Sequence, residues 1–280
     1  MKFVTFAASG GIPTLGAFDG DTVADLGTIA GSMLALIQGG ASSLSAARVA
    51  FASAKRTPLS QVRLLAPVVP GKILCSGVNY KAHALENPKA VMPSEPFFFT
   101  KLPSSVCGPD TDVARPDRVS QMDYEVEFSV VIGKRLFHAD EADVMPSIFG
   151  YTLLNDFSAR DVQFKENQIT LGKNFAGFAP IGPCIVTTDE LTNPSSVRLT
   201  THVNGRTLQD GSTSDWLFSL PRLISFLSGV MPLEPGDIVT TGTPAGVGFF
   251  QNPQVFLQEG DVVEITAAGI GTLRTRIVRA

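Results

Sequence analysis

Two glutamates stand two positions apart in residues 123–133, which read DYEVEFSVVIG. The β-branched and aromatic residues around them, followed by a glycine, predict a β-strand. Because successive side chains of a strand point to opposite faces, Glu125 and Glu127 share one face and their apolar neighbours share the other. Neighbouring carboxylates repel each other unless a cation separates them, and hard divalent cations prefer oxygen ligands. The pair indicates either a metal site or a strand with a water-facing polar side.

A third carboxylate, Asp156, ends another apolar run, residues 150–155. Residues 156–161 resemble the start of a helix, so Asp156 could be a helix cap. It could equally complete an oxygen-ligand site with Glu125 and Glu127, which would leave positions for water and a bidentate substrate.

Three further segments could contribute to such a site. His83 and Glu86 are three residues apart, so on a helical turn they share a face, and the carboxylate would hold the imidazole in the tautomer that a general base needs. Lys173 could bind a substrate carboxylate or stabilise an enolate. The glycines of residues 241–248 indicate backbone that approaches a ligand closely. A surface pair, a surface charge and an ordinary loop are the respective alternatives.

The elements that must position these residues fall into two units, which meet near Pro67 and Pro70. We predict a small N-terminal α/β unit, residues 1–70, and a strand-rich unit, residues 71–280. Helices are too few for a doubly wound βαβ repeat, so the pattern predicts an α+β, predominantly β fold of mixed, folded-over sheets. Predicted strands span 2–7, 14–18, 22–26, 73–76, 97–100, 124–132, 149–154, 181–186, 197–203, 237–241, 262–266 and 271–278, and predicted helices span 32–38, 43–55 and 219–227.

Composition excludes several classes of protein. The chain has 280 residues, a net charge of −4 and scattered basic residues, which argues against nucleic-acid or anionic-membrane partners. Three widely spaced cysteines form no disulfide framework or metal-ligand spacing. We expect no signal peptide, find no apolar run long enough to cross a bilayer, and expect a cytoplasmic protein.

Together these segments resemble the fumarylacetoacetate hydrolase family over about residues 70–278. The resemblance is carried by GVNYKAHALE (77–86), FTKLPS (99–104), DYEVE (123–127), NDFSARDVQ (155–163), GK (172–173) and TGTPAGVG (241–248). Asn174 and Leu102 depart from the Ser and Pro that many members have, and could tune substrate choice.

The resemblance implies a mixed β-sandwich roll, a homodimer and a divalent cofactor, Mg²⁺ or Mn²⁺, with Ca²⁺ as a further possibility. It also implies a role for each candidate residue. These are metal ligands Glu125, Glu127 and Asp156, a water-activating dyad of His83 and Glu86 on a lid, the site lysine Lys173, and substrate-pocket residues Arg160, Gln163 and Thr243. The variable loops 85–93 and 249–253 are expected to form pocket walls.

This chemistry suits a 2-oxo or 2,4-dioxo acid that chelates a metal ion. We expect a hydrolase that cleaves a C–C bond in a 2,4-diketo acid, such as an acylpyruvate, a fumarylacetoacetate-like compound or a diketo-deoxy sugar acid. The dyad would activate water, and the metal with Lys173 would stabilise the pyruvate-type enolate.

The same enolate chemistry without attack by water gives the alternatives. These are an oxaloacetate decarboxylase or a keto–enol tautomerase or isomerase of unsaturated dicarboxylates, and, more remotely, an inactive metal-binding protein. The presence of both His83 and Glu86 favours hydrolysis or decarboxylation over simple tautomerisation. Dinucleotide binding is excluded because no Gly-x-Gly-x-x-Gly opens a helix after a strand.

Overall fold

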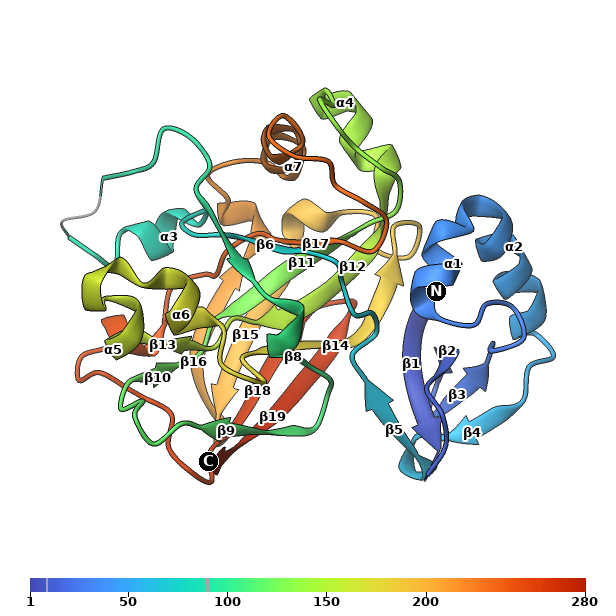
Figure 1. Ribbon diagram of the computed structural model, residues 1–280, viewed down its shortest axis with the longest axis horizontal. Coiled ribbons are helices and arrows are strands. Elements are labelled where there is room, and N and C mark those ends of the chain that lie inside the picture. The colour runs from blue at the N-terminus through green and yellow to red at the C-terminus, as the bar shows by residue number, and fades with distance from the viewer. Residues whose placement is uncertain (9, 89–90) are drawn as a thin grey trace.

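Two β-sheets assembled from distant parts of the chain form the body of the protein (Figure 1). The computed structural model describes residues 1–8, 10–88 and 91–280, with the side chain of Glu166 left aside. The larger sheet runs in the order β4-β3-β2-β1-β14-β12-β11-β17-β6-β7, with β5 beside β1 and β8 beside β14. The smaller sheet runs β16-β15-β18-β19-β9. The prediction of an α+β, predominantly β fold is confirmed.

The strands of the larger sheet are β1 (Lys2–Ala8), β2 (Thr14–Asp19), β3 (Thr22–Asp25), β4 (Arg56–Pro58), β5 (Val62–Leu65), β6 (Ile73–Ser76), β7 (Phe98–Lys101), β8 (Val106–Cys107), β11 (Val126–Ile132), β12 (Ile148–Asn155), β14 (Ala179–Thr187) and β17 (Ile238–Thr240). The smaller sheet contains β9 (Thr111–Arg115), β15 (Arg198–Val203), β16 (Arg206–Ser212), β18 (Val262–Ala267) and β19 (Gly271–Arg279), and a separate ladder pairs β10 (Met122–Asp123) with β13 (Ser158–Ala159). The α-helices are α1 (Met33–Gln38), α2 (Gly40–Phe51), α3 (Lys81–Ala84), α4 (Glu141–Val144), α5 (Arg160–Gln163), α6 (Ile169–Lys173) and α7 (Leu220–Ser228).

Each predicted strand corresponds to an observed one with ends shifted by at most two residues, and α7 lies where the clear helix was predicted. The short helices α4, α5 and α6 were missed, since each has five residues or fewer and so shows no amphipathic period. Figure 1 shows β1–β5 with α1 and α2 at one end of the molecule, and α3, α5 and α6 gathered at the other.

The two sheets enclose the main core. Phe128 and Val130 of β11 belong to the same buried cluster as Ile265 of β18. The alternate residue Val131 belongs to a second cluster, which includes Leu36 of α1. Every residue of β11 is buried. The alternative that this strand has a water-facing polar side is therefore wrong. The reason is that both faces of the larger sheet are covered.

The predicted strand 124–132 is interrupted at its start. Tyr124 and Glu125 lie between β10 and β11, and the backbone N–H of Glu125 donates to Asn155 Oδ1 at 3.1 Å. The N–H of Asp156 donates in turn to the carbonyl of Glu125 at 2.9 Å. The predicted helix start at Asp156 is also wrong: β13 follows, and α5 begins only at Arg160.

The first strand of the chain extends the larger sheet, because Phe3 of β1 pairs with Ile185 of β14. The N-terminal residues are thus hydrogen-bonded to the strands that follow residue 70, and a division into units of 1–70 and 71–280 stays a prediction. Among the described residues, none of the helices has the length and apolar character to cross a membrane.

Candidate active site

Three buried carboxylates meet where β11 and β12 run side by side. Glu125, Glu127 and Asp156 each offer an oxygen atom within 4.8 Å of the others. The antiparallel pairing of Val126 with Asn155 brings the start of β11 next to the end of β12, so the three residues converge from two chain segments. The structure therefore gathers the predicted metal ligands in one place.

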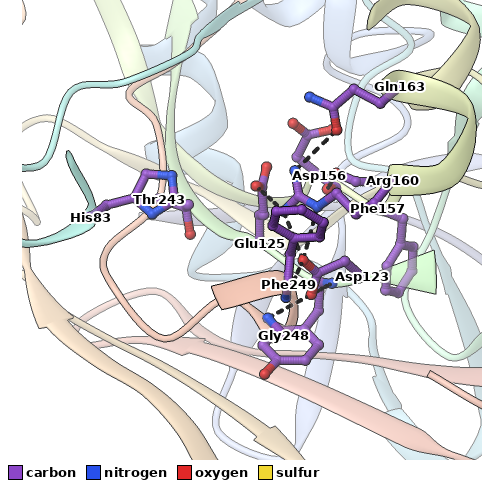
Figure 2. A network of polar contacts seen from close by, with 12 residues as sticks. His83, Asp123, Glu125, Asp156, Phe157, Arg160, Gln163, Thr243, Gly248 and Phe249 are labelled. Atoms are coloured by element: carbon purple, nitrogen blue, oxygen red, sulfur yellow. Dashed lines mark hydrogen bonds and ion pairs between the residues drawn. The ribbon is translucent and has the colours of Figure 1, made fainter. Parts of the chain in front are cut away.

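Three cations surround this carboxylate cluster, and Figure 2 shows one of them, Arg160, beside Glu125. Lys173 Nζ lies 2.7 Å from Glu125 Oε2 and 2.5 Å from Asp156 Oδ2. Lys101 Nζ lies 2.6 Å from Asp156 Oδ1, and Arg160 Nη2 lies 2.5 Å from Glu125 Oε1. Each oxygen of Glu125 and of Asp156 consequently has a cationic partner.

Glu127 differs from the other two carboxylates. Its Oε2 is buried and makes no hydrogen bond to any residue that the structure describes. Burial, with the nearby charges of Asp156 and Glu125, holds the pKa of Glu127 well above its ordinary value. Glu125 is also buried, yet Arg160 and Lys173 keep its pKa well below the ordinary value.

Charge counting leads to the same residue. With every group in its ionised form, Asp123, Glu125, Glu127 and Asp156 bring four negative charges and Lys101, Lys173 and Arg160 bring three positive charges, which leaves a formal net charge of −1. A buried carboxylate without a partner is costly, and a divalent cation would satisfy it. The donors fit Mg²⁺ or Mn²⁺, since all three are carboxylate oxygens.

Lys173 keeps its charge in this setting. Burial opposes the charged form, but Asp156 and Glu125 outweigh burial, so the pKa of the Lys173 ammonium is raised. Lys101 behaves differently, because burial dominates and lowers its pKa.

Lys101 is a site residue that the residue types alone did not indicate. It is the last residue of β7 and is 1% exposed, and it also donates to the carbonyls of Phe157 (3.1 Å) and Lys173 (2.5 Å). The signal was a lysine closing an aromatic strand, a position at which a charged side chain needs a buried partner.

Arg160 connects the cluster to the glycine-rich loop through Asp123. Arg160 Nε donates to Asp123 Oδ2 at 2.9 Å, and Nη1 donates to Gln163 Oε1 at 3.1 Å. Asp123 also accepts from the backbone N–H groups of Gly248 (2.7 Å) and Phe249 (3.0 Å). In the sequence Asp123 stood out only as the first residue of the DYEVE segment, and its role as an anchor was missed.

His83 and Glu86 form the predicted pair at α3. His83 Nδ1 lies 2.6 Å from Glu86 Oε2, and the other oxygen of Glu86 accepts from the N–H of Gly246 at 2.7 Å. The Glu86 contact occupies Nδ1 and leaves Nε2 for a ligand. The imidazole ring lies against Phe250, with ring centroids 6.0 Å apart.

A cavity of about 190 Å³ brings most of these groups to one wall. Five of the nine predicted site residues line it: His83, Glu125, Arg160, Gln163 and Lys173. Apolar side chains complete the lining, among them Phe99 and Phe250, so the loop 249–253 reaches the wall as expected. No described residue of the loop 85–93 lines the cavity, and residues 89 and 90 lie outside the described part of the chain.

Thr243, like Glu86, Glu127 and Asp156, does not line this cavity. It is buried and accepts a hydrogen bond from Gln209 Nε2 at 2.7 Å. In Figure 2 Thr243 and His83 lie on one side of Glu125, while Arg160 and Gln163 lie on the other.

Residues 72–278 match the model of the fumarylacetoacetate (FAA) hydrolase C-terminal domain. The chain belongs to the fumarylacetoacetate hydrolase family.

Relatives within the family include enzymes of more than one activity. Oxaloacetate tautomerase YisK of Bacillus subtilis is 41% identical over 90% of this chain and 88% of its own length. The human mitochondrial oxaloacetate tautomerase FAHD2A is 39% identical over 96% of this chain and 84% of its own. Among solved structures, maleylpyruvate hydrolase from Sphingobium sp. SYK-6, in complex with manganese(II) ion and pyruvate, is 30% identical with a TM-score of 0.85, and all of both chains is covered.

The glycine-rich segment of this family member approaches protein groups in the structure. Gly246 has a φ of 109°, and an added Cβ would overlap the carbonyl oxygen of Leu208 on β16. A Cβ on Gly248 would meet the carbonyl of Val255 and the carboxylate of Asp123. The glycines therefore allow tight packing of the loop, and the expected close approach to a ligand stays a prediction.

The two departures from common family residues contact each other. The backbone N–H of Leu102 donates to Asn174 Oδ1 at 2.5 Å, and Asn174 Nδ2 donates to the carbonyls of Thr100 and Thr170. A proline at 102 would have no N–H to give. The pair thus ties α6, which carries Lys173, to the end of β7.

Proposed function

We propose that the protein catalyses keto–enol tautomerisation of oxaloacetate or a similarly small 2-oxo dicarboxylate, with a divalent metal ion as cofactor. The cavity carries this proposal, because its wall combines the His83 imidazole with the cations of Arg160 and Lys173 in about 190 Å³. Pockets for drug-sized ligands have roughly 300–1,000 Å³, so this volume favours a four-carbon substrate over a bulky acylpyruvate. Two relatives that match at least 90% of the chain bear the name oxaloacetate tautomerase.

The proposal changes the order of candidates that the residue types alone favoured, in which hydrolysis came first. The His83–Glu86 pair does not separate the two reactions, since one base can take a proton from carbon or from water. The cavity volume and the named relatives both support tautomerisation of a small dicarboxylate over hydrolysis of a larger diketo acid.

Glu125, Glu127 and Asp156 would hold the metal ion. When bound, Mg²⁺ or Mn²⁺ supplies a Lewis acid that polarises the 2-oxo group of the substrate. Added to the net charge of −1 of the buried cluster, a divalent ion gives +1, which attracts a dianionic substrate. Arg160 and Lys173 face the cavity and favour the same sign of ligand.

In this proposal, His83 is the group that moves the proton. With Nδ1 held by Glu86, Nε2 takes a proton from carbon 3 of the keto form. The enolate oxygen takes a proton from solvent, and the proton on His83 returns to solvent, which completes the exchange. The Lys173 ammonium stabilises the negative charge that develops on the enolate oxygen.

Hydrolysis of a 2,4-diketo acid is the second candidate. It is favoured by the same pair, because an imidazole oriented by a carboxylate can activate water. A structurally similar protein from Sphingobium sp. SYK-6 bears the name maleylpyruvate hydrolase, which supports this candidate.

The test follows the enol absorbance of oxaloacetate with purified protein and Mg²⁺. We expect acceleration of enol–keto exchange, and a loss of roughly 10²–10⁴-fold in His83→Asn, the range for removing a general base. His138→Asn is the matched control, since His138 is exposed and has a φ of 51°, which asparagine tolerates.

Two parallel assays separate the candidates. Release of pyruvate from an acylpyruvate, without faster enol–keto exchange, would replace the proposal by hydrolysis. Pyruvate formed from oxaloacetate would identify decarboxylation, and full activity of His83→Asn in every assay would remove the role given to His83.

A further inference from the structure

Gln209, on β16, lies outside every motif of the sequence and makes four hydrogen bonds from a fully buried amide. Its Oε1 accepts from the backbone N–H of Val126 at 3.1 Å and from Thr201 Oγ1 at 2.7 Å. Its Nε2 donates to Thr243 Oγ1 at 2.7 Å and to the carbonyl of Pro244 at 2.8 Å. The amide is therefore fully satisfied, and its orientation is fixed.

The partners determine which end of the amide faces Thr243. A backbone N–H can only donate, so the atom that faces Val126 must be the amide oxygen. The carbonyl of Pro244 can only accept, so the atom that faces it must be the amide nitrogen. The nitrogen is consequently the donor toward Thr243, and the Thr243 hydroxyl acts as an acceptor in that bond.

A hydroxyl that accepts one hydrogen bond still has its own proton to donate. No described residue accepts a hydrogen bond from Thr243 Oγ1, although the side chain is buried. A buried donor without an acceptor costs free energy unless a ligand supplies one.

The position of the other partner links Gln209 to the carboxylate cluster. Val126 stands between Glu125 and Glu127, so one amide holds both the segment with these two proposed metal ligands and the loop that carries Thr243.

We propose that Gln209 is a positioning residue, which holds Thr243 as a hydrogen-bond acceptor so that the Thr243 hydroxyl proton is donated to an oxygen of the bound 2-oxo acid. The inference rests on the proposed function for the identity of the ligand.

The experiment is a double-mutant cycle with Gln209→Met, Thr243→Val and the double variant. For oxaloacetate we expect each single variant to raise KM by roughly tenfold to a hundredfold, the range for losing a hydrogen bond to a charged group. The change in kcat should be smaller. Because Gln209 acts through Thr243, the double variant should have the KM of Thr243→Val alone.

Thr201→Val is the matched control. It removes another hydrogen bond of the same amide, at a fully buried position, without touching Thr243. It should lower the melting temperature and leave KM unchanged. If Gln209→Met does not fold, Gln209→Leu takes its place in the cycle.

Each outcome decides the inference. If the fold-changes in KM of the two single variants multiply in the double variant, Gln209 has a merely structural role. The same conclusion follows if KM rises equally in Thr201→Val. The same cycle on the dissociation constant of oxalate, measured by calorimetry with Mg²⁺, needs no turnover. A wild type that does not enolise oxaloacetate removes the proposed function, whereas unchanged oxalate binding and KM in Thr243→Val remove this inference.

Discussion

Glu127 is the residue at which the site is electrostatically incomplete. Glu125 and Asp156 each touch two cations, while Glu127 Oε2 makes no hydrogen bond within the described chain. Burial and its two carboxylate neighbours raise the pKa of Glu127, so the charged form is unfavourable until a cation arrives. The metal site is accordingly a source of strain in the metal-free protein.

Replacing this charge should separate stability from metal binding. Glu127→Gln keeps the volume and removes the cost of burying an acid whose pKa is raised by burial, Asp156 and Glu125, so we expect the metal-free protein to gain about 1 kcal/mol, or roughly 2–4 °C in melting temperature. The rise in melting temperature that Mg²⁺ gives the wild type should disappear in the variant.

Thermal unfolding with and without Mg²⁺ checks this result. Exposed Glu259→Gln is the control and should keep the response to Mg²⁺. A Glu127→Gln protein that is stabilised by Mg²⁺ as strongly as the wild type would contradict Glu127 as a ligand.

Lys101 should matter most when no metal is bound. Lys101→Met leaves Asp156 with Lys173 as its remaining cation, and breaking a buried ion pair costs about 3–5 kcal/mol. Urea unfolding measures the loss, which Mg²⁺ should partly offset because the ion supplies the missing positive charge. Exposed Lys134→Met should stay within about 0.5 kcal/mol of the wild type. Equal losses with and without Mg²⁺ would argue that Lys101 is only structural.

At the scale of elements, the glycine-rich loop contacts the segment just after α3 and also contacts β16. Its Gly246 donates to Glu86, and the same residue packs against the carbonyl of Leu208. The orientation of the His83–Glu86 pair therefore depends on how closely this loop approaches the smaller sheet.

Two glycines with positive φ allow this dependence to be measured. Gly246→Ala adds a clash with Leu208 to the strain of a φ of 109°, whereas Gly205→Ala, at a φ of 79° in the β15–β16 turn, has open space around its Cβ. Both should lose about 1–3 kcal/mol through backbone strain. Only Gly246→Ala should also lose kcat/KM, because the contact with Glu86 shifts. Loss of activity in both variants would point to global destabilisation instead.

At the scale of the whole molecule, the sheets bury groups that would otherwise be reactive. Burial raises the pKa of the Cys107 and Cys184 thiols to about 12, and that of Cys75 well above its ordinary value. The thiolate is the reactive form, so all three thiols should resist a disulfide reagent at pH 8 in the folded protein. All three should react once the chain is unfolded in guanidinium. Cys75 and Cys184 are buried and Cys107 is partly buried, so rapid titration of native Cys75 or Cys184 would contradict their position in the core.

Local patterns predicted much of the fold for a physical reason. A strand alternates its side chains over a few residues, so the apolar runs located the main strands and separated Glu125 and Glu127 from Val126 and Phe128. Short helices such as α5 escaped, because four residues carry no period and depend on the contacts around them.

The sequence by itself determined which residues could form the site: a pair of carboxylates on one strand face, a third at a strand end, and a histidine with its glutamate. Tertiary structure alone decided how these charges are balanced. Lys101 from β7, Asp123 from β10 and Gln209 from β16 reach the site from distant elements, and their roles exist only as contacts with it. A side chain's neighbours along the chain do not reveal which distant group will neutralise or orient it, because burial and pairing are properties of the assembled sheets.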